Sequence, residues 1–322
     1  MNGVRVATTG LSLRVLLTST LVFGVVAGVL GVLLWSSGAS GAEGVGLWLG
    51  VSLTFLFAQW WFGPALIRWS TGASEVSEHE APRLHAMVGR LAALAGVPKP
   101  KLLVVRNPTP NAFAFGRTQA SSYVAVHTGL LERLGEKEVE AVLAHEIGHI
   151  KHRDVLVMTV ASALPVMLYY AFILFGGSLF GGRDREERGG FIAVWLGAVA
   201  AQFIGSLLVM FLSRTREYYA DAFSAYATGE PLALASALAK ITYFPVRAGA
   251  ANAAVKALYI AEPGARGLSH ELAAAIAHGD ERALHEAIEK EKGHGAFELF
   301  MTHPPTWKRL EALMRIRGEI AA

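Results

Sequence analysis

The stretch AVLAHEIGH, which runs from Ala141 to His149, places two histidines four positions apart. In an α-helix, residues at this spacing lie on one face, so His145 and His149 would point the same way, with Glu146 projecting beside them. Two imidazoles in that arrangement can bind one tetrahedral zinc ion, and the glutamate can act as a base. A helix with two surface histidines would carry the same letters, so the zinc prediction needs support from the rest of the chain.

A third metal ligand has to come from elsewhere, because a catalytic zinc site uses three protein ligands and keeps one position open for water. Glu217 is the best candidate, although it lies 68 residues after His149. Two apolar stretches intervene, and a pair of membrane spans would return the chain to the side that it left. Asp221, four residues later on the same helix face, could orient a zinc-bound imidazole. Each carboxylate could also be an ordinary surface residue.

The residues before the motif predict a small sheet between two helices. Apolar residues recur at helical spacing over residues 84–95, and Gly96, Val97 and Pro98 are expected to end that helix. Residues 130–149 are predicted to be helical and to carry both histidines, with an acidic start at Glu136 and Glu138 that complements the helix dipole. Three strand-like runs separated by proline, glycine and polar residues lie between the helices. These runs are residues 102–105, 112–115 and 122–126.

The composition is that of a membrane protein, with 53% hydrophobic and only 17% charged residues among 322. Four uncharged stretches are each long enough to cross a bilayer as a helix. The first could instead be a signal peptide, but its apolar run exceeds a usual signal sequence. The four stretches are residues 15–42, 44–67, 155–182 and 189–213.

These stretches divide the chain into four parts. Residues 1–70 would form a transmembrane hairpin with spans at about 15–35 and 46–67, and residues 155–212 would form a second hairpin. Residues 71–154 and 213–322 would then share one side of the membrane and build the working domain. Basic residues gather near the span ends on that side, which predicts that it is cytoplasmic, together with both termini. They are Arg5, Arg14, Arg68, Lys151, Arg153, Arg214 and Arg216, whereas Arg183, Arg185 and Arg188 fall on the other side.

Charge and residue types exclude several other roles. The net charge of +3 is dispersed and forms no basic stripe with interleaved aromatic residues, so nucleic acid is not an expected partner. The chain has no cysteine, so any metal site must use histidine and carboxylate ligands. Four histidines in the alanine-rich residues 248–294 lack paired ligand spacing and are assigned to amphipathic helices rather than to a second metal site. They are His270, His278, His285 and His294.

Several separated motifs resemble the HtpX branch of the membrane zinc peptidases, which also include the CAAX prenyl proteases. Residues 141–149 resemble the zinc-binding helix of that family, and residues 213–221 resemble its third-ligand helix. Residues 110–116 are similar to its substrate-side edge strand, and residues 302–305 with Arg309 are similar to its C-terminal segment. The resemblance covers nearly the whole chain. It implies a mainly α fold, namely a four-span α-helical membrane protein with a zincin-like cytoplasmic catalytic domain that carries a small β-sheet.

The resemblance also implies roles for particular residues. Glu217 would be the third zinc ligand, and His303 or Arg309 would lie near the scissile carbonyl. Pro304 and Pro305 also suit a helix start, which is the alternative explanation for the segment around His303. An extended substrate would pair with the backbone of the edge strand through main-chain hydrogen bonds. The residues implied in that pairing are Asn111, Ala112 and Phe113, although Asn111 could equally be an ordinary turn residue.

The expected reaction is therefore peptide hydrolysis with one zinc ion per chain, in which Glu146 takes a proton from water and passes it to the leaving amine. By resemblance, the substrates would be misfolded or damaged membrane proteins, cleaved on the cytoplasmic side of the cell (inner) membrane as quality control. A prenylated CAAX substrate is less favoured, since those relatives resemble longer chains with more spans.

Two other functions share the motif. A zinc transporter can place a similar pair within a span, but charged residues at 132–140 and 151–154 put this one at the membrane surface. A silent scaffold with a structural zinc would need four protein ligands, and only three are evident.

Overall fold

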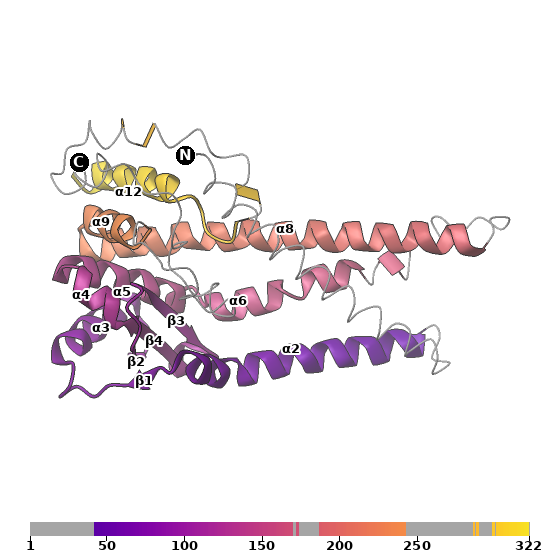
Figure 1. The fold of residues 1–322 in the computed structure, drawn as a ribbon, viewed down its shortest axis with the longest axis horizontal. Coiled ribbons are helices and arrows are strands. Elements are labelled where there is room, and N and C mark those ends of the chain that lie inside the picture. The colour runs from indigo at the N-terminus through magenta and orange to yellow at the C-terminus, as the bar shows by residue number, and fades with distance from the viewer. Residues whose placement is uncertain are drawn as a thin grey trace.

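The computed structural model describes residues 42–169, 172–173, 187–242, 286, 288–289, 298–299 and 301–321. The predicted first span at 15–35 and the histidines at 270, 278, 285 and 294 lie outside these residues. Figure 1 shows three helices, α2, α6 and α8, that extend in the same direction from a unit made of the sheet and the shorter helices. The fold is mostly helical with a small sheet, as predicted.

The sheet has four strands in the order β1-β2-β4-β3. They are β1 (Ser74–Glu75), β2 (Lys101–Val105), β3 (Ala112–Gly116) and β4 (Ser122–His127). The three predicted strands are confirmed, and the short β1 adds an antiparallel edge that the sequence did not suggest. β2 and β4 run parallel, whereas β3 pairs with β4 antiparallel.

In the described sheet, β3 is an edge strand whose backbone hydrogen bonds alternate between β4 and the open side. The His127 N–H donates to the Asn111 carbonyl at 2.9 Å, which marks this facing pair as hydrogen-bonded. Two residues on, Phe113 therefore also directs its backbone groups toward β4. Ala112 and Ala114, at the positions between, direct theirs to the open edge.

The first helix of the catalytic part, α3 (Pro82–Ala95), ends where the sequence predicts. Gly96 follows it in the left-handed conformation with φ of 69°, and its N–H donates to the carbonyls of the last turn. Glycine adopts this conformation at little cost, which makes it a common residue just after a helix.

The helical stretch predicted over residues 130–149 is divided into two helices, and the second begins at the predicted acidic start. α4 (Thr128–Arg133) ends at Leu134, whose backbone is extended with φ of −97° and ψ of 140°. α5 (Glu136–Lys151) then starts afresh after Gly135, whose N–H donates to a carboxylate oxygen of Glu138 at 2.8 Å. This carboxylate contact with the backbone N–H just before the helix is a helix start signal, and it outweighs the helical propensity of the flanking leucines.

α5 carries the two histidines and lies between the sheet and α8 (Glu187–Thr228), as Figure 1 shows. The close approach of α5 to α8 depends on Gly148, because a Cβ there would lie only 3.1 Å from the Ala220 Cα. On its other sides α5 contacts α3 and α9 (Pro231–Thr242). α12 (Thr306–Ala321) packs against α8 and α9 and closes this core.

The helices that extend from the sheet-containing unit expose apolar side chains on their surfaces. α2 (Ala42–Thr71) and α6 (Asp154–Ala161) expose large apolar side chains, among them Phe62 and Val160. By length and composition, the described residues contain one helix that could cross a membrane, Ala193–Thr228, in which an 18-residue stretch has a mean hydropathy of 2.0. A shorter apolar helix spans Asp154–Tyr169. The predicted number of four spans is therefore not confirmed.

Candidate metal centre

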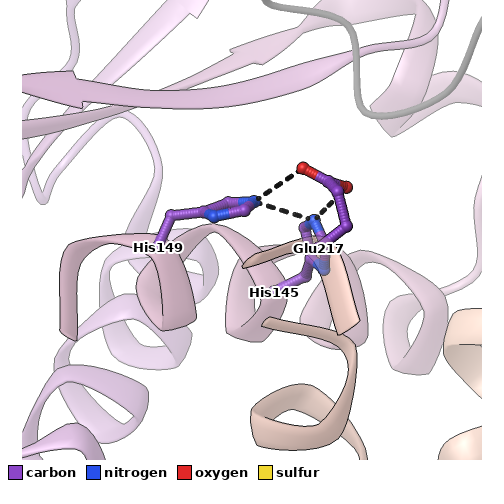
Figure 2. Close-up of side chains that lie close together, drawn as sticks. All are labelled: His145, His149 and Glu217. Carbon is purple, nitrogen blue, oxygen red and sulfur yellow. Dashed lines mark hydrogen bonds and ion pairs between the residues drawn. The ribbon is translucent and has the colours of Figure 1, made fainter. Parts of the chain in front are cut away.

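Three side chains from two helices converge on one point (Figure 2). His145 and His149 stand one turn apart on α5, and their Nε2 atoms are 3.1 Å apart. Glu217 comes from α8, with its two carboxylate oxygens 3.6 Å from Nε2 of His145 and 3.5 Å from Nε2 of His149. The predicted juxtaposition of Glu217 with the two histidines is thus present.

The spacing of these atoms suits a small tetrahedral metal ion. An ion bound at about 2.0–2.1 Å from each ligand would hold neighbouring ligand atoms about 3.3–3.4 Å apart. The three separations of 3.1, 3.5 and 3.6 Å bracket that value. In the part of the chain that the structure describes, the group able to hold a metal consists of these three residues, which leaves a coordination position for water.

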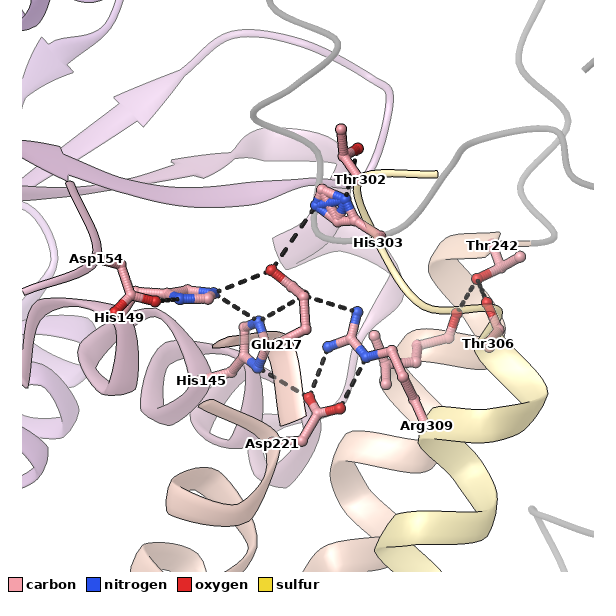
Figure 3. Close-up of polar contacts among 11 residues, drawn as sticks. His145, His149, Asp154, Glu217, Asp221, Thr242, Thr302, His303, Thr306 and Arg309 are labelled. Carbon is pink, nitrogen blue, oxygen red and sulfur yellow. Dashed lines mark hydrogen bonds and ion pairs between the residues drawn. The ribbon is translucent and has the colours of Figure 1, made fainter. Parts of the chain in front are cut away.

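The second ring nitrogen of each histidine faces a carboxylate (Figure 3). Nδ1 of His145 lies 2.9 Å from Oδ1 of Asp221, the residue predicted for this role. Nδ1 of His149 lies 2.6 Å from Oδ2 of Asp154, a residue for which no role was predicted. A carboxylate on Nδ1 fixes the tautomer that leaves Nε2 free for a metal. The available signal for Asp154 was an acidic residue just beyond the end of the motif helix.

Each carboxylate is in turn paired with an arginine. The guanidinium of Arg309 donates to both oxygens of Asp221, at 2.8 and 2.6 Å, and lies 3.2 Å from Glu217. Arg216 forms an ion pair with Asp154 and also donates to the backbone carbonyl of His152 at 2.6 Å. We call His145, Asp221 and Arg309 the inner arm, and His149, Asp154 and Arg216 the outer arm.

The charges of the site are set by burial and by these pairs. Burial alone would lower the pKa of His145, but the contacts with Asp221 and Glu217 raise it to about 9. The pKa of His149 is lowered, first by burial and then by the neighbouring charge on His145. Although burial opposes it, the carboxylates of Asp221 and Glu217 raise the pKa of Arg309, so its charge is permanent.

Glu146 lies next to the ligands, on the side that faces the sheet. It is 3% exposed, and this burial raises the pKa of its carboxyl above the usual range. Its carboxylate accepts a hydrogen bond from the backbone N–H of Ala114, one of the residues whose backbone faces the open edge of β3. The predicted base and the edge strand are therefore in direct contact.

The two residues expected near a scissile carbonyl occupy different positions (Figure 3). His303 approaches from the loop before α12, with Nε2 3.8 Å from a Glu217 oxygen and a side chain that is 13% exposed. Arg309 is 1% exposed and is engaged with two carboxylates behind the metal position. This placement favours a structural task for Arg309 and leaves His303 on the accessible side.

A cavity of about 390 Å³ lies beside His149. Its walls come from the C-terminal half of β3, the loop at residues 117–120 and the start of α6. Of the three residues predicted to contact substrate, Ala112 alone turns its backbone to the open edge, while Asn111 and Phe113 direct theirs to β4. Ala114, which sequence reasoning missed, shares the orientation of Ala112.

Comparisons with known proteins identify the family of this chain. The sequence model of peptidase family M48 matches residues 78–317. A protein named "Protease HtpX homolog" from Moorella thermoacetica is 39% identical over 318 residues, which cover 97% of this chain and 96% of that protein. A protein of the same name from Methanothermobacter thermautotrophicus is 45% identical over 237 residues, covering 74% and 88% of the two chains. The crystal structure of S. mikatae Ste24p shares the fold, with a TM-score of 0.52 at 18% identity, over 95% of this chain and 67% of that chain.

Proposed function

The chain belongs to peptidase family M48, alongside the HtpX homologues, and is a metalloprotease. We propose that it is a zinc-dependent endopeptidase of the membrane. The observation that carries the proposal is the group of His145, His149 and Glu217, with Glu146 buried beside it. Two imidazoles and one carboxylate are a common ligand set for catalytic zinc. Because only three residues supply ligands, one coordination position remains for the water that hydrolysis consumes.

Glu146 is the proposed proton carrier. A bound zinc ion would supply Lewis-acid activation of water at this place. Glu146 takes a proton from the attacking water and delivers it to the leaving amine, so that one carboxyl serves as base and then as acid. Its raised pKa brings the carboxyl closer to the operating pH, which favours this exchange in both directions.

The substrate would lie extended along the open edge of β3. Ala112 and Ala114 turn their backbone groups to this edge, and main-chain hydrogen bonds place few demands on substrate sequence. Because the N–H of Ala114 contacts the Glu146 carboxylate, a peptide on this edge passes directly over the proposed base. This arrangement suits an enzyme that cleaves unfolded segments of many sequences.

His303 is the proposed donor to the oxygen of the scissile carbonyl. It stands on the accessible side of Glu217, whereas Arg309 is held by Asp221. Negative charge that develops on the carbonyl oxygen would accept a hydrogen bond from the imidazole, which lowers the barrier to attack.

The proposed setting is the cell (inner) membrane, crossed by four spans, with the active site and both termini on the cytoplasmic side. α8 supports it, because 42 helical residues extend about 63 Å, twice the thickness of a hydrocarbon core. Its apolar first part can cross the bilayer while its last part carries Glu217 beyond the membrane surface. Substrates would be misfolded or damaged membrane proteins, cut where an unfolded segment reaches the cytoplasm.

The test is cleavage of an unfolded protein by detergent-purified, zinc-loaded enzyme. Glu146→Gln is expected to abolish cleavage at unchanged zinc content, because the amide cannot take the proton. Glu140→Gln is the matched control, since Glu140 lies on the same helix and pairs with Arg90 away from the site. A Glu146→Gln enzyme that cleaves like the wild type would refute the mechanism, and zinc-free wild type with full activity would refute the metal assignment.

A further inference from the structure

The outer arm differs from the inner arm in the position of its carboxylate. Asp154 lies at the turn that leads from the catalytic core into α6. α5 ends at Lys151 and α6 begins at Asp154, so only two residues separate the helices. Within this short turn the chain reverses enough for Asp154 to reach back to His149 at 2.6 Å. Helical periodicity does not bring residues five apart into such contact.

The reversal depends on Arg153. Its φ is 56°, and it is the one non-glycine residue with a positive φ in the part of the chain that the structure describes. Residues other than glycine avoid the left-handed region, and they keep it where the surrounding contacts impose it. The contacts here are the Asp154 carboxylate on His149 and Arg216 across from it.

Arg216 fixes the same turn from the other side. It comes from α8, one residue before Glu217, and its guanidinium pairs with Asp154 while donating to the carbonyl of His152 at 2.6 Å. The side chains of Arg216 and Asp154 are 15% and 11% exposed. One arginine thus joins the end of α5, the start of α6 and the ligand-bearing part of α8.

We propose that Asp154 and Arg216 are a positioning pair that holds the imidazole of His149 with Nε2 toward the metal and ties the metal centre to the start of α6. Asp154 accepts the hydrogen from Nδ1, which keeps His149 in the tautomer that can bind zinc. Arg216 pairs with the Asp154 carboxylate and holds it directed at the ring. The inference rests on the zinc site of the proposed function but not on the identity of the substrate.

A simpler explanation would be that Asp154 only stabilises α6, since an acidic residue in the first turn interacts favourably with the helix dipole. That role needs neither the contact with His149 nor burial against Arg216, and it predicts no effect on the metal. The two explanations therefore differ in the properties of a bound metal ion.

The experiment measures zinc affinity by competition with a chelator, and the visible absorption of bound Co²⁺, for the full chain in detergent. Asp154→Ala is expected to weaken zinc binding about a hundredfold and to change the Co²⁺ spectrum, because the His149 ring loses its anchor. Asp154→Asn should lose only about tenfold, since its amide oxygen can still accept from Nδ1. Glu140→Gln, which alters another carboxylate–arginine pair of α5, should bind both metals as the wild type does.

Unchanged zinc affinity and an unchanged Co²⁺ spectrum in Asp154→Ala would overturn the inference while leaving the proposed function intact. If Asp154→Ala does not fold, Asp154→Asn decides in its place: a wild-type affinity and spectrum overturn the inference, and a weakened, altered site supports it. A folded wild type that binds neither metal would instead refute the zinc site on which the proposed function depends.

Discussion

The two imidazoles point at one metal position, but the inner and outer arms behind them lie in different parts of the molecule. Asp221 and Arg309 of the inner arm are both 1% exposed and join α8 to α12 within the core. The side chains of Asp154 and Arg216 in the outer arm are 11% and 15% exposed, so they are less completely buried, and they lie where the core passes into α6. A buried charge depends fully on its partner, whereas a partly hydrated one does not. The inner arm should therefore govern folding, and the outer arm the geometry of the metal.

Replacing each arginine tests this difference most severely. Arg309→Met leaves the carboxylates of Asp221 and Glu217 buried without their cation, which should cost about 3–5 kcal/mol of folding stability. Arg216→Met removes a partner that water can replace only in part, and its cost should be smaller, about 1–3 kcal/mol. Unfolding midpoints of the metal-free proteins, measured in one detergent, give the comparison. Equal losses for the two variants would show that the arms do not divide the work in this way.

His303 belongs to neither arm, so its replacement should separate catalysis from metal binding. His303→Ala is expected to lower kcat about a hundredfold, because one donor to the developing oxyanion is lost. Zinc content and the unfolding midpoint should stay at their wild-type values, since the ring is partly exposed and its Nε2 is 3.8 Å from Glu217. Steady-state kinetics on an unfolded protein substrate, with zinc measured in the same samples, checks this. Near-normal turnover would remove His303 from the mechanism.

Gly148 tests how closely α8 must approach α5. Its missing side chain lets α8 approach α5, and a Cβ there would press on the Ala220 backbone at 3.1 Å. Gly148→Ala should gain about 1 kcal/mol in helix propensity but lose about 1–3 kcal/mol to overpacking. The net change in stability is small, yet α8 must shift and carry Glu217 with it. We expect zinc affinity to fall more than stability, and an unchanged affinity would show that the site absorbs the shift.

The parts of the site that could be predicted from sequence are those fixed by helical periodicity. The spacing within α5 predicted His145 and His149 as a pair, and the spacing within α8 placed Asp221 on the face of Glu217. The meeting of these helices followed from the even number of apolar stretches between them. None of these inferences needs the conformation of a loop.

What could not be predicted depends on single turns and on register. The contact of Asp154 with His149 arises from one left-handed residue, for which the sequence offers an arginine rather than a glycine. Which residues of β3 face its open edge depends on whether Asn111 or Ala112 forms backbone hydrogen bonds with β4. A shift of one residue in the register would exchange the edge-facing and the β4-facing residues. The break at Gly135 likewise follows from a capping contact, not from a change in hydrophobic pattern.

Arg153 gives the smallest and most local test of the outer arm. Glycine suits a φ of 56°, so Arg153→Gly should fold with a stability within about 1 kcal/mol of the wild type, as relief of strain offsets the added chain entropy. Arg153→Val should lose about 1–2 kcal/mol, because a β-branched side chain resists this conformation. If the turn exists to place Asp154 on His149, zinc affinity should change in parallel with stability in the two variants. Arg153→Gly should then retain the wild-type zinc affinity. Paired measurements of unfolding midpoint and zinc affinity decide this. A glycine variant that is stable but binds zinc weakly would mean that the arginine side chain itself, rather than its backbone conformation, supports the metal.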